Sequence, residues 1–217
     1  MDPFLLLTPM SVLLVSLAGR RWGPVVGGRL TALPLTSGPL VLIVGATHGP
    51  TAADTLANGV LAGMPTVVVF CASYLHLATR HSWRVCLPAS FAATALGAGV
   101  LSLAHLPPAI SAAFVGVSAL LARRLPRSDH RSSAPVWELP VRIILTTGLV
   151  QGLSVLTTVC GPRLAGVLAT FPALACVLAA MAHRGSGPGA ARELLRGVLT
   201  GLLPTAALFL ALAGFLG

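Results

Sequence analysis

The sequence predicts an all-α, polytopic membrane protein with about eight transmembrane helices in two inverted repeats. Of its 217 residues, 55% are hydrophobic and only 9% are charged, and the mean hydropathy is +0.90. A water-soluble domain carries about 25% charged residues. In addition, residues 23–63 align without a gap to residues 161–201, with identity at 15 of 41 positions. A match of this length indicates an internal duplication.

Apolar runs that approach or reach the length needed to cross a bilayer, ~17–25 residues, recur along the chain. The first run is not read as a signal peptide, because Asp2 precedes it and Arg20 and Arg21 follow it. One membrane domain is expected over 1–217, with repeat one at about 1–122, a cytoplasmic linker at 123–136 and repeat two at 137–217. The expected spans are residues 4–18, 24–46, 53–77, 85–104, 109–122, 139–159, 164–182 and 194–215.

The basic residues predict the sidedness of these spans. All 14 are arginines, and most of them fall in the loops after the first, third, fifth and seventh spans. Loops rich in positive charge face the cytoplasm, so both termini are expected outside. The absence of lysine points to a GC-rich bacterial genome and hence to the bacterial inner membrane. Nucleic acid is not expected as a partner, since neither a soluble basic fold nor a continuous basic helix is present.

The order of the expected spans predicts that the repeats are inverted. The second span corresponds to the seventh, and an offset of five spans reverses the direction of the second copy. Inverted repeats are a recurring construction of secondary transporters. Two Gly-x-x-x-Gly motifs stand at matched positions, Gly59/Gly63 and Gly197/Gly201, and predict a close contact between the third and eighth spans.

The stretch Leu33–Pro39 is the first candidate for a substrate-binding site. Pro34 and Pro39 remove backbone donors, so an interrupted helix is expected. Such a break exposes amides and carbonyls that can coordinate an ion or a polar substrate group. The expected contacts are Pro34, Thr36, Ser37 and Gly38. The alternative is a proline kink whose hydroxyls bond back to the preceding turn.

The span at 139–159 carries the second candidate. Thr147, Gln151, Ser154 and Thr158 are four, three and four residues apart, so they share one helical face. Polar side chains in lipid turn toward protein or water. We read Gln151, with Thr147 and Ser154, as the wall of a substrate pathway. The alternative for the hydroxyl residues is hydrogen bonding between helices.

Asp54 and Asn58 form a third candidate, for an ion or a proton. They lie one turn apart near the outer end of the third span. A carboxylate there could bind a cation or relay protons. The alternative is an acid near a helix start that the helix dipole favours.

Other chemistry is not expected. The histidines have no metal-ligand spacing with thiols or carboxylates, and no cofactor is predicted. Gly28 is followed by Arg29 and Leu30 rather than by the Lys and Ser/Thr of a phosphate loop. No Ser/His/Asp set suggests a catalytic centre, so the chain is not read as an enzyme.

The runs WGPVVGGRLTALPLTSGP (22–39), VWELPVR (136–142) and GPRLAGVLATFPALACVLAAMAHR (161–184) resemble a family of uncharacterised bacterial multi-spanning membrane proteins. The resemblance covers most of the chain and implies no activity for any residue. The leading interpretation is a small secondary transporter of an unknown small molecule or ion in the lipid bilayer. The alternative is a non-transporting scaffold, assembly factor or partner subunit. The oligomeric state does not follow from the sequence.

Overall fold

The computed structural model describes residues 3–34, 37–104, 107–124, 138–160 and 172–216. Within these ranges every regular element is helical, in agreement with the predicted all-α class. The helices are α1 (Pro3–Trp22), α2 (Pro24–Ala32), α3 (Ser37–His48), α4 (Pro50–Leu77), α5 (Trp83–Ala104), α6 (Pro108–Arg124), α7 (Glu138–Cys160), α9 (Ala173–Ser186) and α10 (Pro188–Leu216).

Three of the described helices are long and apolar enough to cross a bilayer. They are α4, α10 over Pro188–Phe215, and α5 over Trp83–Leu101. A shorter apolar stretch covers Leu139–Gly152 of α7. By length and composition, the chain therefore has helices suited to a membrane protein.

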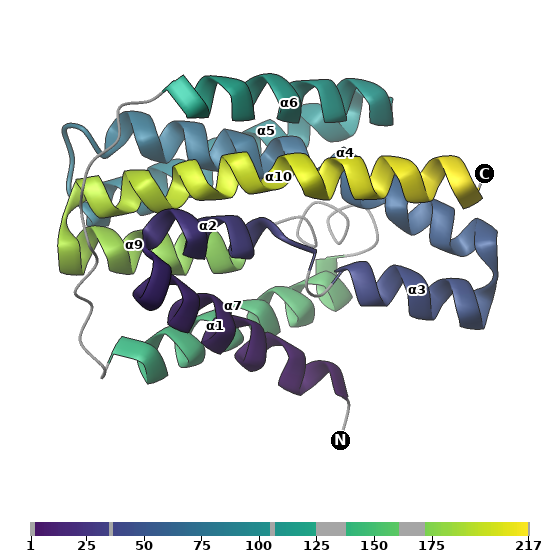
Figure 1. Ribbon diagram of the computed structural model, residues 1–217, viewed down its shortest axis with the longest axis horizontal. Helices are drawn as coiled ribbons and strands as arrows, with labels where there is room; N and C mark the ends of the chain where they lie inside the picture. The colour runs from purple at the N-terminus through teal and green to yellow at the C-terminus, as the bar shows by residue number, and fades with distance from the viewer. Residues whose placement is uncertain (1–2, 35–36, 105–106, 125–137, 161–171, 217) are drawn as a thin grey trace.

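Helix α10 lies across the middle of the bundle and contacts α2, α4, α6 and α9 (Figure 1). Helix α4 packs on α3, α5 and α6 as well, whereas α7 packs on α1 and α9. The hydrophobic core forms mainly where α4, α9 and α10 meet, and includes Phe70, Leu178, Leu195 and Phe209. These side chains are fully or almost fully buried, so α10 is the element on which much of the bundle is assembled.

Gly-Pro pairs make three of the sharp corners between helices. Gly23, Gly49 and Gly187 have φ of 94°, 88° and 84°, with ψ of 166°, 169° and 176°. This region of backbone space is essentially restricted to glycine. The proline that follows each glycine opens the next helix, at the position where a missing N–H costs least. Each Gly-Pro pair therefore ends one helix and starts the next, and a single glycine separates the two helices.

These corners correct the expected loop lengths. The expected spans 24–46 and 53–77 leave residues 47–52 as a link, but Gly49 alone separates α3 from α4. Its amide N–H donates to the Gly45 carbonyl at 3.2 Å, and its carbonyl accepts from Ala53 at 3.4 Å, so Gly49 closes one helix and opens the next. The predicted cytoplasmic linker is shortened at its start, because α6 continues to Arg124; residues 125–137 lie outside the described residues.

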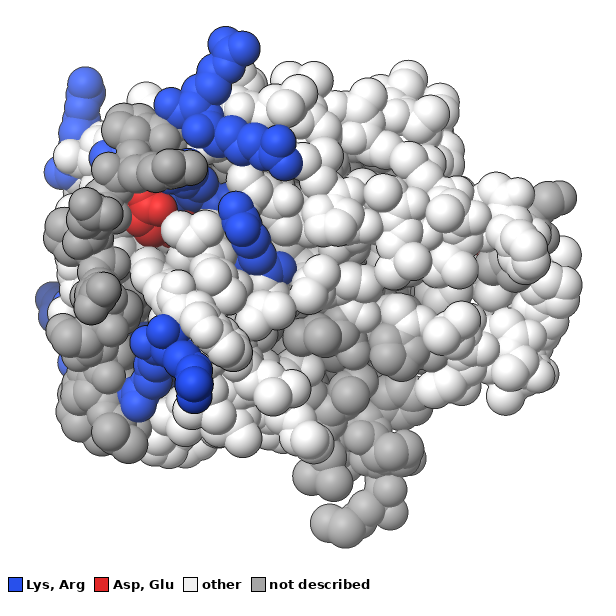
Figure 2. All heavy atoms as spheres, viewed as in Figure 1, with Lys and Arg blue, Asp and Glu red and all other residues white. Residues whose placement is uncertain are grey.

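Positive charge is concentrated at one end of the face that Figure 2 shows. Figure 2 shows the arginines gathered at the left-hand end, whereas the right-hand half of this face carries no charged atoms. The α9–α10 corner lies at the arginine-rich end, and the α3–α4 corner and the C-terminus lie at the opposite end (Figure 1). The asymmetry that the sequence predicts from its loops is thus present in three dimensions.

Candidate functional site at the interrupted helix α2–α3

The interruption that the sequence predicts near Pro34 separates α2 from α3. Helix α2 closes with the Leu33 N–H donating to the Leu30 carbonyl at 3.2 Å. Leu33 itself is extended, with ψ of 146°, as residues before proline prefer. The Gly38 N–H donates to the Pro34 carbonyl at 2.9 Å as α3 begins. Thr36 and the side chain of Ser37 lie outside the described residues, so their proposed contacts stay predictions.

A threonine from α10 satisfies a backbone carbonyl at the end of α2. The buried Thr205 hydroxyl donates to the Ala32 carbonyl at 2.8 Å, across 173 positions of sequence. The last carbonyls of a helix have no partner within it, and an unpaired buried carbonyl is costly. Thr205 therefore holds the break against α10. Nothing in the local sequence pattern distinguishes it from other hydroxyls.

Glycines bring α2 and α10 into backbone contact. A Cβ added to Gly28 would collide with the Leu194 carbonyl oxygen, and one added to Gly197 would collide with that of Val25. At Gly201 an added Cβ would lie 2.7 Å from the Arg29 carbonyl oxygen. Gly197 and Gly201 therefore make their close backbone contact with α2, whereas the sequence predicts it with the third span, which is α4. Helices α4 and α10 do pack together, but Gly59 faces open space while Gly63 is buried.

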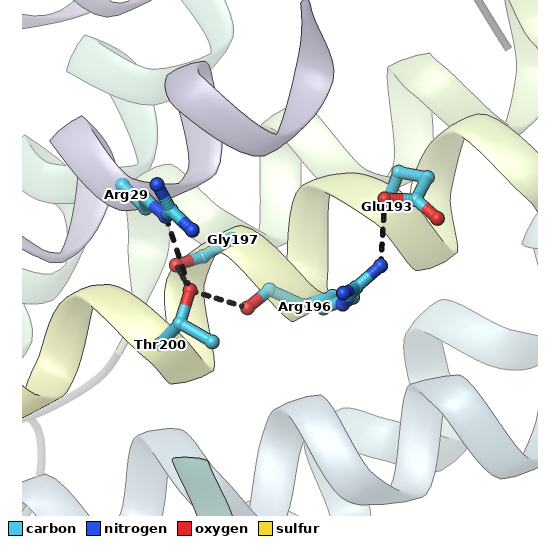
Figure 3. Close-up of polar contacts among 5 residues, drawn as sticks. All are labelled: Arg29, Glu193, Arg196, Gly197 and Thr200. Atoms are coloured by element: carbon cyan, nitrogen blue, oxygen red, sulfur yellow. Dashed lines mark hydrogen bonds and ion pairs between the residues drawn. The ribbon is translucent and has the colours of Figure 1, made fainter. Parts of the chain in front are cut away.

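Buried charges on α10 form a feature that the sequence reasoning missed. Glu193 and Arg196 are only 4% and 8% exposed, and they form an ion pair at 3.5 Å. Arg29 of α2, which is exposed, donates from Nε to the Thr200 hydroxyl at 3.4 Å (Figure 3). The available signal was the spacing of three between Glu193 and Arg196 just inside the last apolar run.

On α7 the predicted polar face is divided. Gln151 is exposed, so its amide does not point into the described interior. Thr147 is half-buried, and its hydroxyl oxygen has no hydrogen-bond partner among the described residues. The side chains of Ser154 and Thr158 lie outside the described residues. The pathway wall that the sequence predicts on α7 therefore stays a prediction.

Asp54 and Asn58 pair with each other on α4. The Asn58 amide donates from Nδ2 to Asp54 Oδ1 at 2.9 Å, and both side chains are half-buried. An amide one turn along the helix is a common partner for a carboxylate near a helix start. The contact gives Asp54 a partner on its own helix and leaves both the ion-binding interpretation and the helix-dipole alternative predictions.

A second polar contact joins α4 to α9 inside the core. The Tyr74 hydroxyl lies 3.2 Å from His183 Nδ1, and the two rings meet edge to face at a centroid distance of 5.9 Å. Three cysteines are buried free thiols: Cys71, Cys86 and Cys176. Over the part of the chain that the structure describes, no three His, Cys, Asp or Glu side chains are arranged to hold a metal ion.

Comparisons with protein-family models, curated proteins and solved structures found no match for this chain. The resemblance carried by the run 22–39 and its counterparts therefore stays a prediction. The site is defined by its geometry alone: a helix broken at Leu33, anchored by Thr205, and crossed by α10 at three glycines.

Proposed function

We propose that the chain is an integral protein of the bacterial inner membrane with eight spans and both termini outside. Its surface supports this, because large apolar side chains are exposed on α1, α3, α5, α6, α7 and α10. Soluble monomers rarely expose apolar area on this scale. The arginine-rich end then faces the cytoplasm, as positive charge does in inner-membrane proteins.

We propose further that the two halves are inverted repeats. With the offset of 138, α3, Gly49, Pro50 and α4 correspond to α9, Gly187, Pro188 and α10. Both glycines have positive φ, and the helices that follow them have 28 and 29 residues. The corner at Gly49 and the corner at Gly187 lie at opposite ends of the bundle (Figure 1).

The function that this arrangement supports best is that of a small secondary transporter for a small molecule or ion. The interrupted helix α2–α3, within a repeat whose counterpart runs in the opposite direction, is the observation that carries the proposal. Transporters with inverted repeats place substrate at discontinuous helices near the bilayer midplane. In this proposal Thr36 and Ser37 supply hydroxyls at the break. Gln151 is kept as the proposed amide contact from α7, although its side chain is exposed in the structure. No catalytic residue is assigned.

The sidedness experiment uses two repeat-equivalent positions, His48→Cys and Ser186→Cys, each in a variant with the native cysteines replaced by serine. In intact cells, a membrane-impermeant maleimide is expected to label the cysteine at 48 and to leave the one at 186 unmodified until the membrane is opened. Labelling of both from the same side contradicts the inversion and removes the main support for transport.

The transport experiment follows solute uptake into proteoliposomes across a panel of small ions and metabolites. For a solute that the wild type carries, alanine at Thr36, Ser37 or Gln151 is expected to lower uptake at least tenfold. Thr55→Ala is the control, because this exposed hydroxyl on α4 donates back to the Thr51 carbonyl of its own helix. Uptake unchanged in all three variants rejects the assigned contacts.

The alternative function is that of a membrane scaffold or partner subunit, and the exposed face of α7 favours it. Gly148, Gln151 and Gly152 are exposed there, and both glycines face open space. Small residues beside an amide are typical of helix–helix contacts in lipid. A photocrosslinker at Gly148 that traps one stoichiometric partner in cells, together with the absence of any solute flux, supports this alternative over transport.

A further inference from the structure

Arg29 is an exposed cation on a helix that is otherwise uncharged and is held tightly against α10. It stands in the last turn of α2, where the backbone touches α10 at Gly201. The glycine contacts leave α2 no room to rotate or shift against α10. The contact between α2 and α10 therefore fixes the direction in which the Arg29 side chain projects. A ligand that binds Arg29 meets a group that is already oriented.

The guanidinium is oriented by a hydroxyl rather than neutralised by a carboxylate. Its Nε donates to Thr200, whose own hydroxyl donates back to the carbonyls of Arg196 and Gly197 at 3.0 and 3.1 Å. Among the described residues Arg29 has no ion pair, and Glu193 forms its described ion pair with Arg196 (Figure 3). The two terminal nitrogens are thus available for an external anion.

The depth of Arg29 suits a lipid phosphate. It lies five residues into α2, or about 7.5 Å from the helix start at 1.5 Å per residue. Trp22, just before that start, is exposed in the manner of interfacial tryptophans. A headgroup layer is about 5–8 Å thick on each side of the hydrocarbon core. In the proposed membrane orientation Arg29 therefore lies about 7.5 Å beyond the start of α2, and its partner Thr200 lies twelve residues, or about 18 Å, beyond the start of α10. The guanidinium then meets a headgroup phosphate from below the headgroup layer, as the long side chains of snorkelling arginines do.

We propose that Arg29, oriented by Thr200, binds the phosphate of an anionic phospholipid from the cytoplasmic leaflet. Guanidinium binds phosphate through two parallel hydrogen bonds, which a lysine ammonium cannot reproduce. Beyond Thr200, the exposed Pro204 and Leu208 continue the same face of α10 away from the arginine-rich end. They offer an apolar track for the acyl chains, which a soluble anion would not use.

Native mass spectrometry of the full chain, titrated with phosphatidylglycerol in detergent, tests the site. Arg29→Gln is expected to weaken the tightest lipid-binding event about tenfold or more, the loss typical of a charged hydrogen bond. Arg29→Lys retains part of the binding, and Thr200→Val weakens it severalfold. The matched control is Arg80→Gln, because Arg80 is an exposed arginine in the connection between α4 and α5, at the same end of the bundle as the α9–α10 corner (Figure 1). The lipid affinity of this variant is expected to change less than twofold.

Equal losses in Arg29→Gln and Arg80→Gln overturn the proposal, because they mean diffuse attraction to the whole arginine-rich end. Displacement of the lipid by millimolar inorganic phosphate also overturns it, since the site is then one for a soluble anion. Each variant is measured as a monodisperse species with a wild-type melting curve. The inference depends on the proposed membrane location but not on transport, and the labelling of positions 48 and 186 tests that location separately.

Discussion

Glycine followed by proline determines where helices of this protein end. At Gly187 the chain adopts φ of 84° and ψ of 176°, and the Gly187 N–H donates to the His183 carbonyl at 3.1 Å. Pro188 then starts α10 without needing a helical donor. Any side chain is strained in this conformation. An added Cβ at position 187 would meet no atom within 4 Å. Glycine is therefore required there by the backbone conformation and not by crowding from a neighbouring group.

Gly187→Ala is expected to destabilise the protein by roughly 1–3 kcal/mol, the cost of holding a non-glycine residue in this region. Thermal unfolding in detergent measures the change as a lower midpoint. Gly214→Ala is the control, because Gly214 is helical, exposed and in open space. If both substitutions lower the midpoint equally, the corner does not depend on glycine at this position.

At the scale of the elements, the crossing of α2 and α10 is the contact that positions the candidate site. It places Thr205 against the broken end of α2 and Arg29 against Thr200. The two Gly-x-x-x-Gly motifs, equivalent in sequence, have different surroundings: Gly197 lies against backbone, whereas Gly59 faces open space. The residue type is therefore the same at these two matched positions, but among the described residues backbone lies against Gly197 and not against Gly59.

That difference provides a matched pair of substitutions. Gly197→Ala is expected to force α2 and α10 apart and to cost about 1–3 kcal/mol, as overpacking of a close contact does. Gly59→Ala is expected to be neutral or to stabilise α4 by up to about 1 kcal/mol, because alanine is the better helix former. Chemical denaturation in mixed micelles compares them. Similar losses in the two variants would refute the assignment of the close contact.

At the scale of the whole molecule, one hydrophobic core joins both halves of the chain. Cys71 on α4, Cys86 on α5 and Cys176 on α9 all belong to it and are at most 1% exposed. Apolar burial within the bundle and exposed apolar side chains around it are what a lipid-solvated protein requires. The arginines, in contrast, collect at one end (Figure 2).

We expect these three thiols to resist modification until the bundle unfolds, and then to react in one phase. A thiol-reactive dye, followed during thermal unfolding of a Cys160→Ser variant, measures this against loss of helical circular dichroism. The control is His48→Cys in the same background, since position 48 is exposed and reacts at once. Reaction of one native thiol well before the helices melt would show that α4, α5 and α9 do not form a single cooperative core.

The sequence alone determined the helical class, the apolar solvent that the chain is suited to and the break at Leu33–Pro34. These are local properties, set by hydropathy and by proline's missing N–H. The corners at Gly49 and Gly187 were not predicted, because the sequence does not show that a single glycine at positive φ separates the helices there. Only the tertiary structure decided that α10 crosses α2, that Thr205 satisfies Ala32, and that Glu193 and Arg196 are buried together with α10 in the bundle. Those contacts join positions as far as 173 residues apart, and no spacing along the chain encodes which helices meet.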